Sequence, residues 1–251
     1  MKRITQYILV LTIVSVSLLS ACRGGSSTNA APNADHLVEF DKQGIALLRG
    51  QVTSASATAG QNTEILTIHI PARMDGMDVI VAVTFTLRNE TLVSSSLIKQ
   101  TDLLEYLSFH KGSSAFEAFP ANALVDVTFK KTGTTFIASA IQEVTKKSLF
   151  PKRTVIDPLF TTEGFGEGTL QGTILQTRKQ NNGTVRWTVS VPLTMQGVEI
   201  AVLLPVQSAV DTNVIPAGNT IKTVDTIRGK VKIDFVRSSD TLTARQVTEI
   251  P

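Results

Sequence analysis

The chain contains few of the residues from which catalytic and metal sites are usually built. Its 251 residues include one cysteine and three histidines, His36, His69 and His110. A single cysteine excludes an internal disulfide framework and a cysteine-based metal cluster, and three scattered histidines offer little material for a metal site. The sequence also lacks the G-x-S-x-G, H-E-x-x-H, P-loop and G-x-G-x-x-G motifs. We therefore expect a protein that is not an enzyme, with no catalytic residues, no cofactor and no bound metal.

Aromatic residues and net charge are also scarce. Aromatic side chains make up 6% of the chain, with Trp187 as the one tryptophan, and the formal charge is +3. Proteins that bind single-stranded nucleic acid combine a basic groove with aromatic stacking platforms, so there is no strong case for nucleic acid. Basic pairs occur at residues 130–131, 146–147 and 152–153. Solvated side chains at turns and in a linker explain these pairs, although acidic envelope polymers would attract them weakly.

The amino terminus has the pattern of an export signal. Lys2 and Arg3 precede an apolar stretch of twelve residues, Ile8–Leu19. This stretch is shorter than the roughly 20 residues that a transmembrane helix needs, but it has the length of the apolar region of a secretory signal. Residues 1–21 are therefore predicted to form a signal peptide.

The segment Leu19-Ser20-Ala21-Cys22 resembles the lipobox of bacterial lipoproteins, in which a small residue precedes the cysteine that receives the lipid. The resemblance implies cleavage between Ala21 and Cys22 and a lipid on the Cys22 sulfur. Each buried methylene contributes about 0.8 kcal/mol to anchoring, so two or more acyl chains hold stably. The alternative is an ordinary signal peptide followed by a coincidental cysteine. Cleavage removes Lys2 and Arg3 and no acidic residue, which lowers the formal charge from +3 to +1.

Export and acylation place the expected mature protein at a membrane of the cell envelope. Arg23 is not the aspartate that the family associates with inner-membrane retention, which favours the outer membrane of a two-membrane cell. In a cell with one membrane, the expected place is its outer face. Residues 22–36 are small and polar and are predicted to form a lipidated tether with a reach of roughly 20 Å. The expected partners are the membrane, through Cys22, and an envelope protein or polymer that the sequence does not identify.

The rest of the chain is duplicated. Residues 67–79 match residues 188–200 at an offset of 121, with one threonine, proline, methionine and glycine identical. Upstream, a Gly-x-Val-type segment is repeated at an offset of 122, and downstream residues 125–129 match residues 231–235 at an offset of 106. The fall from 121 to 106 implies about fifteen extra residues in the first copy.

The extra residues coincide with the helix that the sequence predicts. A capping box over residues 102–105 begins this helix, and Lys111-Gly112 ends it. The second copy has Pro205, Pro216 and Gly218 in the corresponding region, which predict a loop. The apolar stripe of the helix is expected to consist of Leu103, Leu104 and Leu107.

The repeated segments have the pattern of β-hairpins. Apolar residues alternate along residues 77–87 and at the corresponding positions of the second copy, as in a strand with one buried face. Asp75-Gly76 and Gln196-Gly197 predict hairpin turns. Pro71 and Pro192 are expected at strand ends, bulges or edges, because proline has no N–H to donate to a ladder.

Each copy is therefore predicted to have five strands, an order similar to the OB-fold, a small Greek-key barrel. The predicted fold is mainly β, with two tandem small OB-like β-barrels, the first carrying one short helix. Two tandem β-sandwich domains are the alternative. The predicted organisation is a signal peptide (1–21), a tether (22–36), a first OB-like domain (37–147), a linker (148–168) and a second OB-like domain (169–251). The linker contains six apolar residues, so it is expected to pack across a barrel surface.

Three short features carry weaker functional hypotheses. His69 lies on a predicted strand and is interpreted as a partly exposed strand residue rather than a ligand or base. Asp75 and Asp78 could form a calcium site or an acid–base pair, but turn chemistry explains Asp75. The glycine-rich segment 164–168 is interpreted as a turn rather than a phosphate-binding loop.

Taken together, the patterns favour a lipid-anchored envelope lipoprotein whose duplicated barrel serves as a non-enzymatic binding or assembly module. The first alternative is a surface protein that binds glycans or nucleic acid through the barrel faces. The second is an envelope hydrolase with a site formed by His69, Asp75, Asp78 and Glu90.

Overall fold

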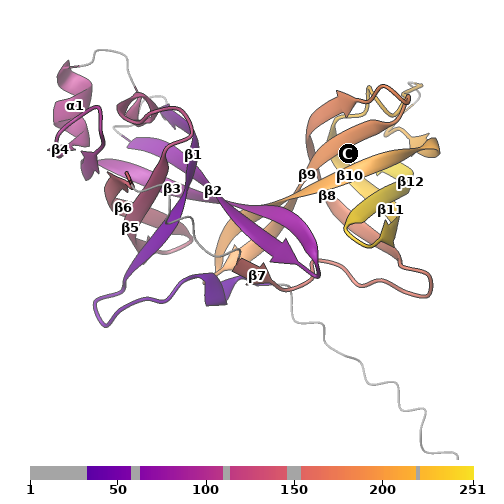
Figure 1. Ribbon diagram of the computed structural model, residues 1–251, viewed down its shortest axis with the longest axis horizontal. Coiled ribbons are helices and arrows are strands. Elements are labelled where there is room, and N and C mark those ends of the chain that lie inside the picture. Colours follow the sequence, from indigo (N-terminus) through magenta and orange to yellow (C-terminus); the bar gives the residue numbers. More distant parts are fainter. Residues whose placement is uncertain (1–32, 58–62, 110–113, 146–153, 219–220) are drawn as a thin grey trace, which may run out of the picture. The chain divides into compact units, whose positions relative to one another are not determined.

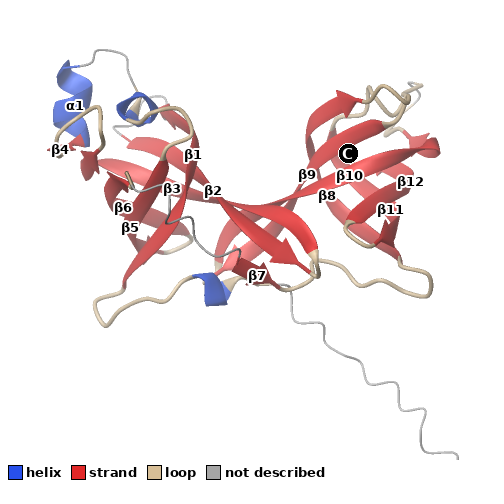
Figure 2. Cartoon of the chain, in the orientation of Figure 1, coloured by secondary structure: helices blue, strands red, loops and turns tan. Residues whose placement is uncertain are grey.

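The computed structural model describes residues 33–57, 63–109, 114–145, 154–218 and 221–251. These residues belong to one compact unit. The unit is built mainly of β-strands with one α-helix, which confirms the predicted fold class (Figure 2). The predicted signal peptide and Cys22 lie outside the described residues.

The five strands of the first copy form a closed barrel (Figure 1). Its strands are β1 (Ile45–Ala57), β2 (Thr63–Met74), β3 (Met77–Ser94), β5 (Leu124–Thr132) and β6 (Thr135–Glu143). β2 pairs antiparallel with β1 and β3, and β5 pairs antiparallel with β1 and β6. Parallel pairing of β3 with β6 closes the ring. Closure hides the strand edges that an open five-stranded sheet would expose.

The second copy forms a barrel with the same connections. Its strands are β8 (Glu167–Lys179), β9 (Val185–Met195), β10 (Val198–Ile215), β11 (Gly229–Ser238) and β12 (Thr241–Glu249). β8 pairs with β9 and β11, β9 pairs with β10, β11 pairs with β12, and parallel pairing of β10 with β12 closes the ring. This is the five-stranded OB order in both copies, and it excludes the β-sandwich alternative.

The two copies correspond in register as well as in order. In the central hairpins, Pro71 pairs with Ile80 and Pro192 pairs with Ala201, so both pairs are related by the offset of 121. Interruptions of the ladders also recur at equivalent places, as duplicated bulges do. One interruption lies between Val52 and Ser54 in the first copy and between Ile174 and Gln176 in the second. The other lies between Leu87 and Leu92 in the first copy and between Ser208 and Asn213 in the second.

The barrels are joined by antiparallel pairing of β3 with β10. Val81 pairs with Val202, which is its own counterpart at the offset of 121. The flanking pairs are Ala82 with Ala201 and Ile80 with Leu203. A contact in which equivalent residues meet is isologous, as at the twofold axis of a homodimer. The two copies are therefore related by an approximate twofold axis that passes between Val81 and Val202.

The hairpin turns repeat this symmetry. The carboxylate and carbonyl oxygens of Asp75, in the β2–β3 turn, accept hydrogen bonds from Arg237 on β11. At the equivalent place, a Cβ added to Gly197 in the β9–β10 turn would lie 3.4 Å from the Nζ atom of Lys131 on β5. Lys131 is the counterpart of Arg237 at the offset of 106. Each barrel thus receives the turn of the other barrel against a basic side chain.

The first copy carries the expected helix between β3 and β5. After the two-residue strand β4 (Thr101–Asp102), α1 (Leu103–Phe109) begins where the Asp102 carboxylate accepts the Glu105 N–H at 2.7 Å, which is the first half of the predicted capping box. The Glu105 carboxylate accepts a hydrogen bond from the Thr101 hydroxyl at 2.6 Å. The buried side chains are Leu103 and Tyr106. Leu104 is exposed, which corrects the predicted stripe. The 3-10 helix η2 (Ala115–Ala118) follows, and Lys111-Gly112 lies outside the described residues.

The predicted loop of the second copy is a strand over much of its length. β10 continues through Pro205 to Ile215. One edge of β10 pairs with β3 up to Leu203 and with β12 from Val206 onward, so Pro205 lies between the two pairings. Proline is tolerated at this position because no strand on that edge needs a backbone N–H from it. Pro71 on β2 lies beyond the part of β2 that pairs with β1, and Pro192 on β9 lies beyond the part of β9 that pairs with β8. Both prolines are therefore at free strand edges, as predicted.

The described part of the predicted tether is docked rather than free. Asn33 forms a bridge with Thr194, and Ala34, which is fully buried, donates its N–H to the Thr194 carbonyl at 2.8 Å. The side chain of Asp35, in η1 (Asp35–Leu37), accepts the Gln196 N–H. Residues 33–36 therefore belong to the folded body because the unpaired edge of β9 offers them hydrogen bonds.

The described part of the predicted linker contacts both barrels. Strand β7 (Thr154–Ile156) pairs in parallel with β2, and Ile156 is buried. Phe160 packs edge-on against Phe235 of the second barrel, with ring centroids 4.8 Å apart. Residues 148–153 lie outside the described residues.

Glu64 is a buried carboxyl in the first barrel, with 3% of its surface exposed. Burial is the main cause that raises its pKa, and the Glu117 charge adds to it, while a 2.7 Å hydrogen bond from the Ala115 N–H opposes the rise. The second copy has buried Val185 at the counterpart position.

A raised carboxyl pKa makes stability depend on pH. The neutral form of Glu64 is favoured in the folded state. Its contribution to folding stability is therefore fully present below the ordinary carboxyl pKa of about 4.3, and it is lost as pH rises through the pKa that Glu64 has in the folded protein. We expect Glu64→Gln to remove this loss, so that the variant gains stability relative to the natural protein as pH rises. Urea unfolding between pH 4 and 8 measures the difference, with exposed Glu199→Gln as control. Parallel stability curves for the Glu64 variant and the natural protein would contradict the assignment.

Candidate functional site

The sequence-predicted histidine and carboxylate candidates do not assemble into one site. His69 is half-buried on β2, opposite Gln51 and Ala82, and burial lowers its pKa. Asp75 is bound to Arg237, and the side chain of Asp78 accepts a hydrogen bond from Arg73 at 3.3 Å. These partners give both carboxylates a structural role. Within the described ranges, no group of three or more His, Cys, Asp or Glu side chains is arranged to hold a metal.

The glycine-rich segment 164–168 forms a tight turn. Gly164 and Gly166 have positive φ angles of 50° and 85°, which glycine adopts without steric cost. The Glu163 N–H donates to the Glu167 carbonyl at 2.8 Å and fixes the base of the turn. Phe165 at its tip is 95% exposed. The segment is a turn, as expected.

The aromatic and basic candidates offer no stacking platform. Trp187 is fully buried and its Nε1 donates to the Val224 carbonyl at 3.1 Å, so it is a core residue. Tyr106 is also buried. Lys130 and Lys131 are exposed at the end of β5, and the pairs at 146–147 and 152–153 lie outside the described residues.

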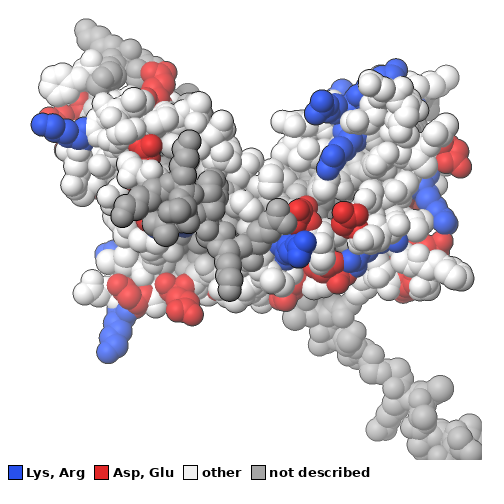
Figure 3. Space-filling model, in the orientation of Figure 1, with Lys and Arg blue, Asp and Glu red and all other residues white. Residues whose placement is uncertain are grey.

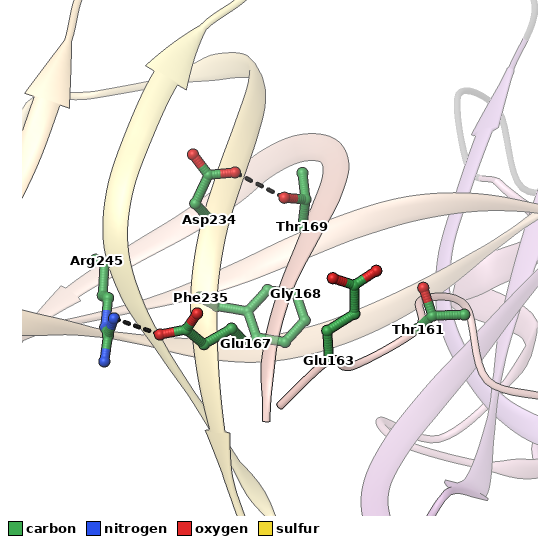
Figure 4. A pocket seen from close by; sticks show the side chains of 8 residues that line it. All are labelled: Thr161, Glu163, Glu167, Gly168, Thr169, Asp234, Phe235 and Arg245. Atoms are coloured by element: carbon green, nitrogen blue, oxygen red, sulfur yellow. Dashed lines mark hydrogen bonds and ion pairs between the residues drawn. The ribbon is translucent and has the colours of Figure 1, made fainter. Parts of the chain in front are cut away.

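A polar hollow of about 500 Å³ lies on the second barrel (Figure 4). Several of its polar side chains pair with each other: Arg245 donates to Glu167 at 2.6 Å, and the Thr169 hydroxyl donates to Asp234 at 2.7 Å. Exposed pairs of this kind hold a surface in place and contribute little energy. The mutual pairing leaves few groups for a ligand, so this hollow is not the stronger candidate.

The stronger candidate is a groove at the junction of the barrels, with a volume of about 530 Å³. One wall comes from β2 and β3, including Pro71 and Ile80, and the other from β8, β9 and β10. The second wall carries Arg178 and Arg186, which lie directly opposite each other on β8 and β9. Strands 2 and 3 of an OB barrel form its usual binding face, and β9 and β10 are those strands here.

The two arginines are an unfavourable pair without a ligand. Like charges directly opposite on neighbouring strands destabilise a sheet. Both side chains are exposed, and neither forms an ion pair with an acidic residue among those that the structure describes. Two convergent guanidinium groups recognise phosphate or carboxylate well. The arrangement is therefore suited to an anionic ligand.

The first copy provides an internal comparison. Its counterparts of Arg178 and Arg186 are Ser56 and Ile65, which form the equivalent cross-strand pair. A hollow of about 460 Å³ on the other side of the junction is lined in part by counterparts of the groove residues, among them Pro192 and Glu199. The fold therefore supplies two related hollows, but only one has the arginine pair. In several places on the face shown in Figure 3, basic and acidic side chains lie beside each other in small groups.

Sequence reasoning missed this arginine pair. Arg178 and Arg186 are equally spaced about Asn182 in the Gln180-Asn181-Asn182-Gly183 turn segment, so a hairpin centred on that segment places them opposite each other. Alignment of the copies would then have shown that the charges are absent from the first copy.

Comparison with known proteins adds little to these observations. No protein-family model matches the chain, and no match is found among curated proteins. Among solved structures, the single-stranded DNA-binding protein from Thermus aquaticus is similar, with 12% identity, coverage of 82% of this chain and 92% of that chain, and a TM-score of 0.21. At this TM-score the likeness carries no argument, and the OB assignment rests on the strand pairings. No helix among the described residues is long and apolar enough to cross a membrane.

The unpaired arginines predict an unusual response to substitution. We expect Arg178→Gln to leave the free energy of unfolding unchanged within about 0.5 kcal/mol or to raise it, because it removes a like-charge contact. Arg49→Gln is the matched structural control. Its guanidinium donates twice to the half-buried Asp126, both at 2.6 Å, so its loss should cost about 1 kcal/mol or more. Urea unfolding measures both, and a destabilised Arg178 variant would show that Arg178 has a structural partner.

Proposed function

We propose that the chain is a lipid-anchored lipoprotein of the cell envelope, whose paired OB-like barrels form a non-enzymatic binding module. The observation that carries the binding role is the unpaired Arg178–Arg186 pair in the groove between the barrels. The lipobox resemblance at residues 19–22 supports the anchor. The expected localisation is the outer membrane of a two-membrane cell or the outer face of a single membrane.

An anionic partner other than nucleic acid fits this role better than the nucleic-acid-binding and hydrolase alternatives. The groove joins positive charge to an apolar floor that includes Ile80 and Leu203. Stacking of nucleic acid bases would need exposed aromatic side chains beside the arginines, whereas no aromatic residue is among those described as lining the groove. A hydrolytic site would need a base and an acid within reach of one substrate, whereas Asp75 and Asp78 are held by arginines.

The anchor is tested by Cys22→Ser. The natural protein should be recovered with the membrane, and mass spectrometry should find a mature chain that begins with a lipidated Cys22. The variant has no thiol to receive the lipid, so we expect it to remain unprocessed by the lipoprotein peptidase and unlipidated. A variant that is processed and still membrane-bound, or a natural protein with an unmodified Cys22, would refute the anchor.

A further inference from the structure

We propose that the groove beside Arg178 and Arg186 binds a single anionic lipid molecule, with its phosphodiester between the two guanidinium groups. The hydroxylated headgroup would lie on one side of the arginines and the start of the apolar chains on the other. This inference rests on the proposed binding role and adds the ligand class.

Two hollows of opposite chemical character share the two arginines. The groove of about 530 Å³ has a largely apolar wall that includes Pro71, Ile80 and Pro205. Asp78 also lines the groove, and its carboxylate accepts a hydrogen bond from Arg73. A second hollow of about 410 Å³ also includes Arg178 and Arg186, but its remaining wall is polar. That wall consists of Lys179, Gln180, Asn181, Asn182 and Gln207.

The arginine pair fits one phosphodiester. The Cβ atoms of directly opposite residues in antiparallel strands lie about 4.5–5.5 Å apart, so both guanidinium groups can reach oxygens of the same phosphate. Arginine presents planar N–H donors that match phosphate geometry. The phosphate would also relieve the repulsion between the two positive charges.

The polar hollow suits the headgroup of the ligand, and the apolar groove suits its hydrocarbon chains. Side-chain amides such as Asn181 both donate and accept hydrogen bonds, as the hydroxyls of a glycerol or sugar headgroup require. On the other side, Ile80 is 38% exposed and faces the groove with buried Leu203. Apolar surface of this kind is favourably covered by hydrocarbon. A charged polymer would have to continue over this apolar wall, which favours an amphiphile.

Native mass spectrometry of the full mature chain, released from a nonionic detergent, tests the inference. The principal probe is dihexanoyl-phosphatidylglycerol, which combines short chains, an anionic phosphodiester and headgroup hydroxyls. Dihexanoyl-phosphatidylcholine keeps the chains but adds a cationic headgroup, and glycerol 3-phosphate lacks the chains. We expect the phosphatidylglycerol to bind at least tenfold more tightly than either comparison probe.

Substitutions locate the binding. The double variant Arg178→Gln with Arg186→Gln should bind the phosphatidylglycerol at least tenfold more weakly, because charge-assisted hydrogen bonds are lost. The matched control removes the same charge from exposed positions of the first copy, by Lys42→Gln with Lys130→Gln, and should bind within twofold of the natural chain. Urea unfolding should show that both variants remain folded.

Each contrary result identifies what fails. Equal binding of the two lipids, or unchanged binding by the arginine variant, would overturn the inference. Binding of glycerol 3-phosphate as tight as that of the lipid would show a simple anion site and would also overturn it. Binding of a ten-nucleotide oligothymidylate through the arginines, without lipid binding, would overturn the lipid but keep the binding role. Binding of none of these probes would overturn both.

Discussion

The antiparallel pairing of β3 with β10 is the interaction on which the rest of the structure depends. Parallel pairing with β6 or β12 closes each barrel, but this pairing does not extend to residues 80–82 of β3 or to residues 201–203 of β10. The free edges of these two segments instead pair with each other around Val81 and Val202. It also brings the turn of each central hairpin to the other barrel, where Arg237 holds Asp75. The groove exists because this junction sets two barrel walls side by side.

The approximate symmetry makes the differences between the copies informative. The ladders of the two copies are interrupted at equivalent places, so side chains can be compared position by position. Arg178 and Arg186 stand where the first copy has Ser56 and Ile65. The helix α1 occurs only in the first copy among the described residues. The first barrel thus carries an additional helix, and the second carries two arginines without an acidic partner beside the junction.

The sequence predicted what depends on local pattern and on comparison of the copies. Strand alternation, turn residues and the Asp102 cap are local, and the offset of 121 aligned the hairpins in the register that the structure has. Pro205 misled the loop prediction because whether a strand tolerates proline depends on where its neighbours end. The junction was missed although Ile80 gave a signal: an apolar residue on a face expected to be exposed. The arginine pair was missed because the turn at residues 180–183 was not recognised, and only a hairpin centred on that turn places Arg178 opposite Arg186.

The most direct measurement of the junction is a cross-strand disulfide. In the full chain with Cys22→Ser, Ala82→Cys and Ala201→Cys place two thiols on a directly paired position of β3 and β10. Antiparallel partners have Cα separations of about 4.5–5.5 Å, within the range that a disulfide spans. Mass spectrometry should find the intramolecular bond after mild oxidation. It should not find it when Ala209→Cys replaces Ala201→Cys, because that position is roughly 25 Å further along β10. Absence of the bond in the first variant, or equal bond formation in both, would contradict the pairing of the two copies.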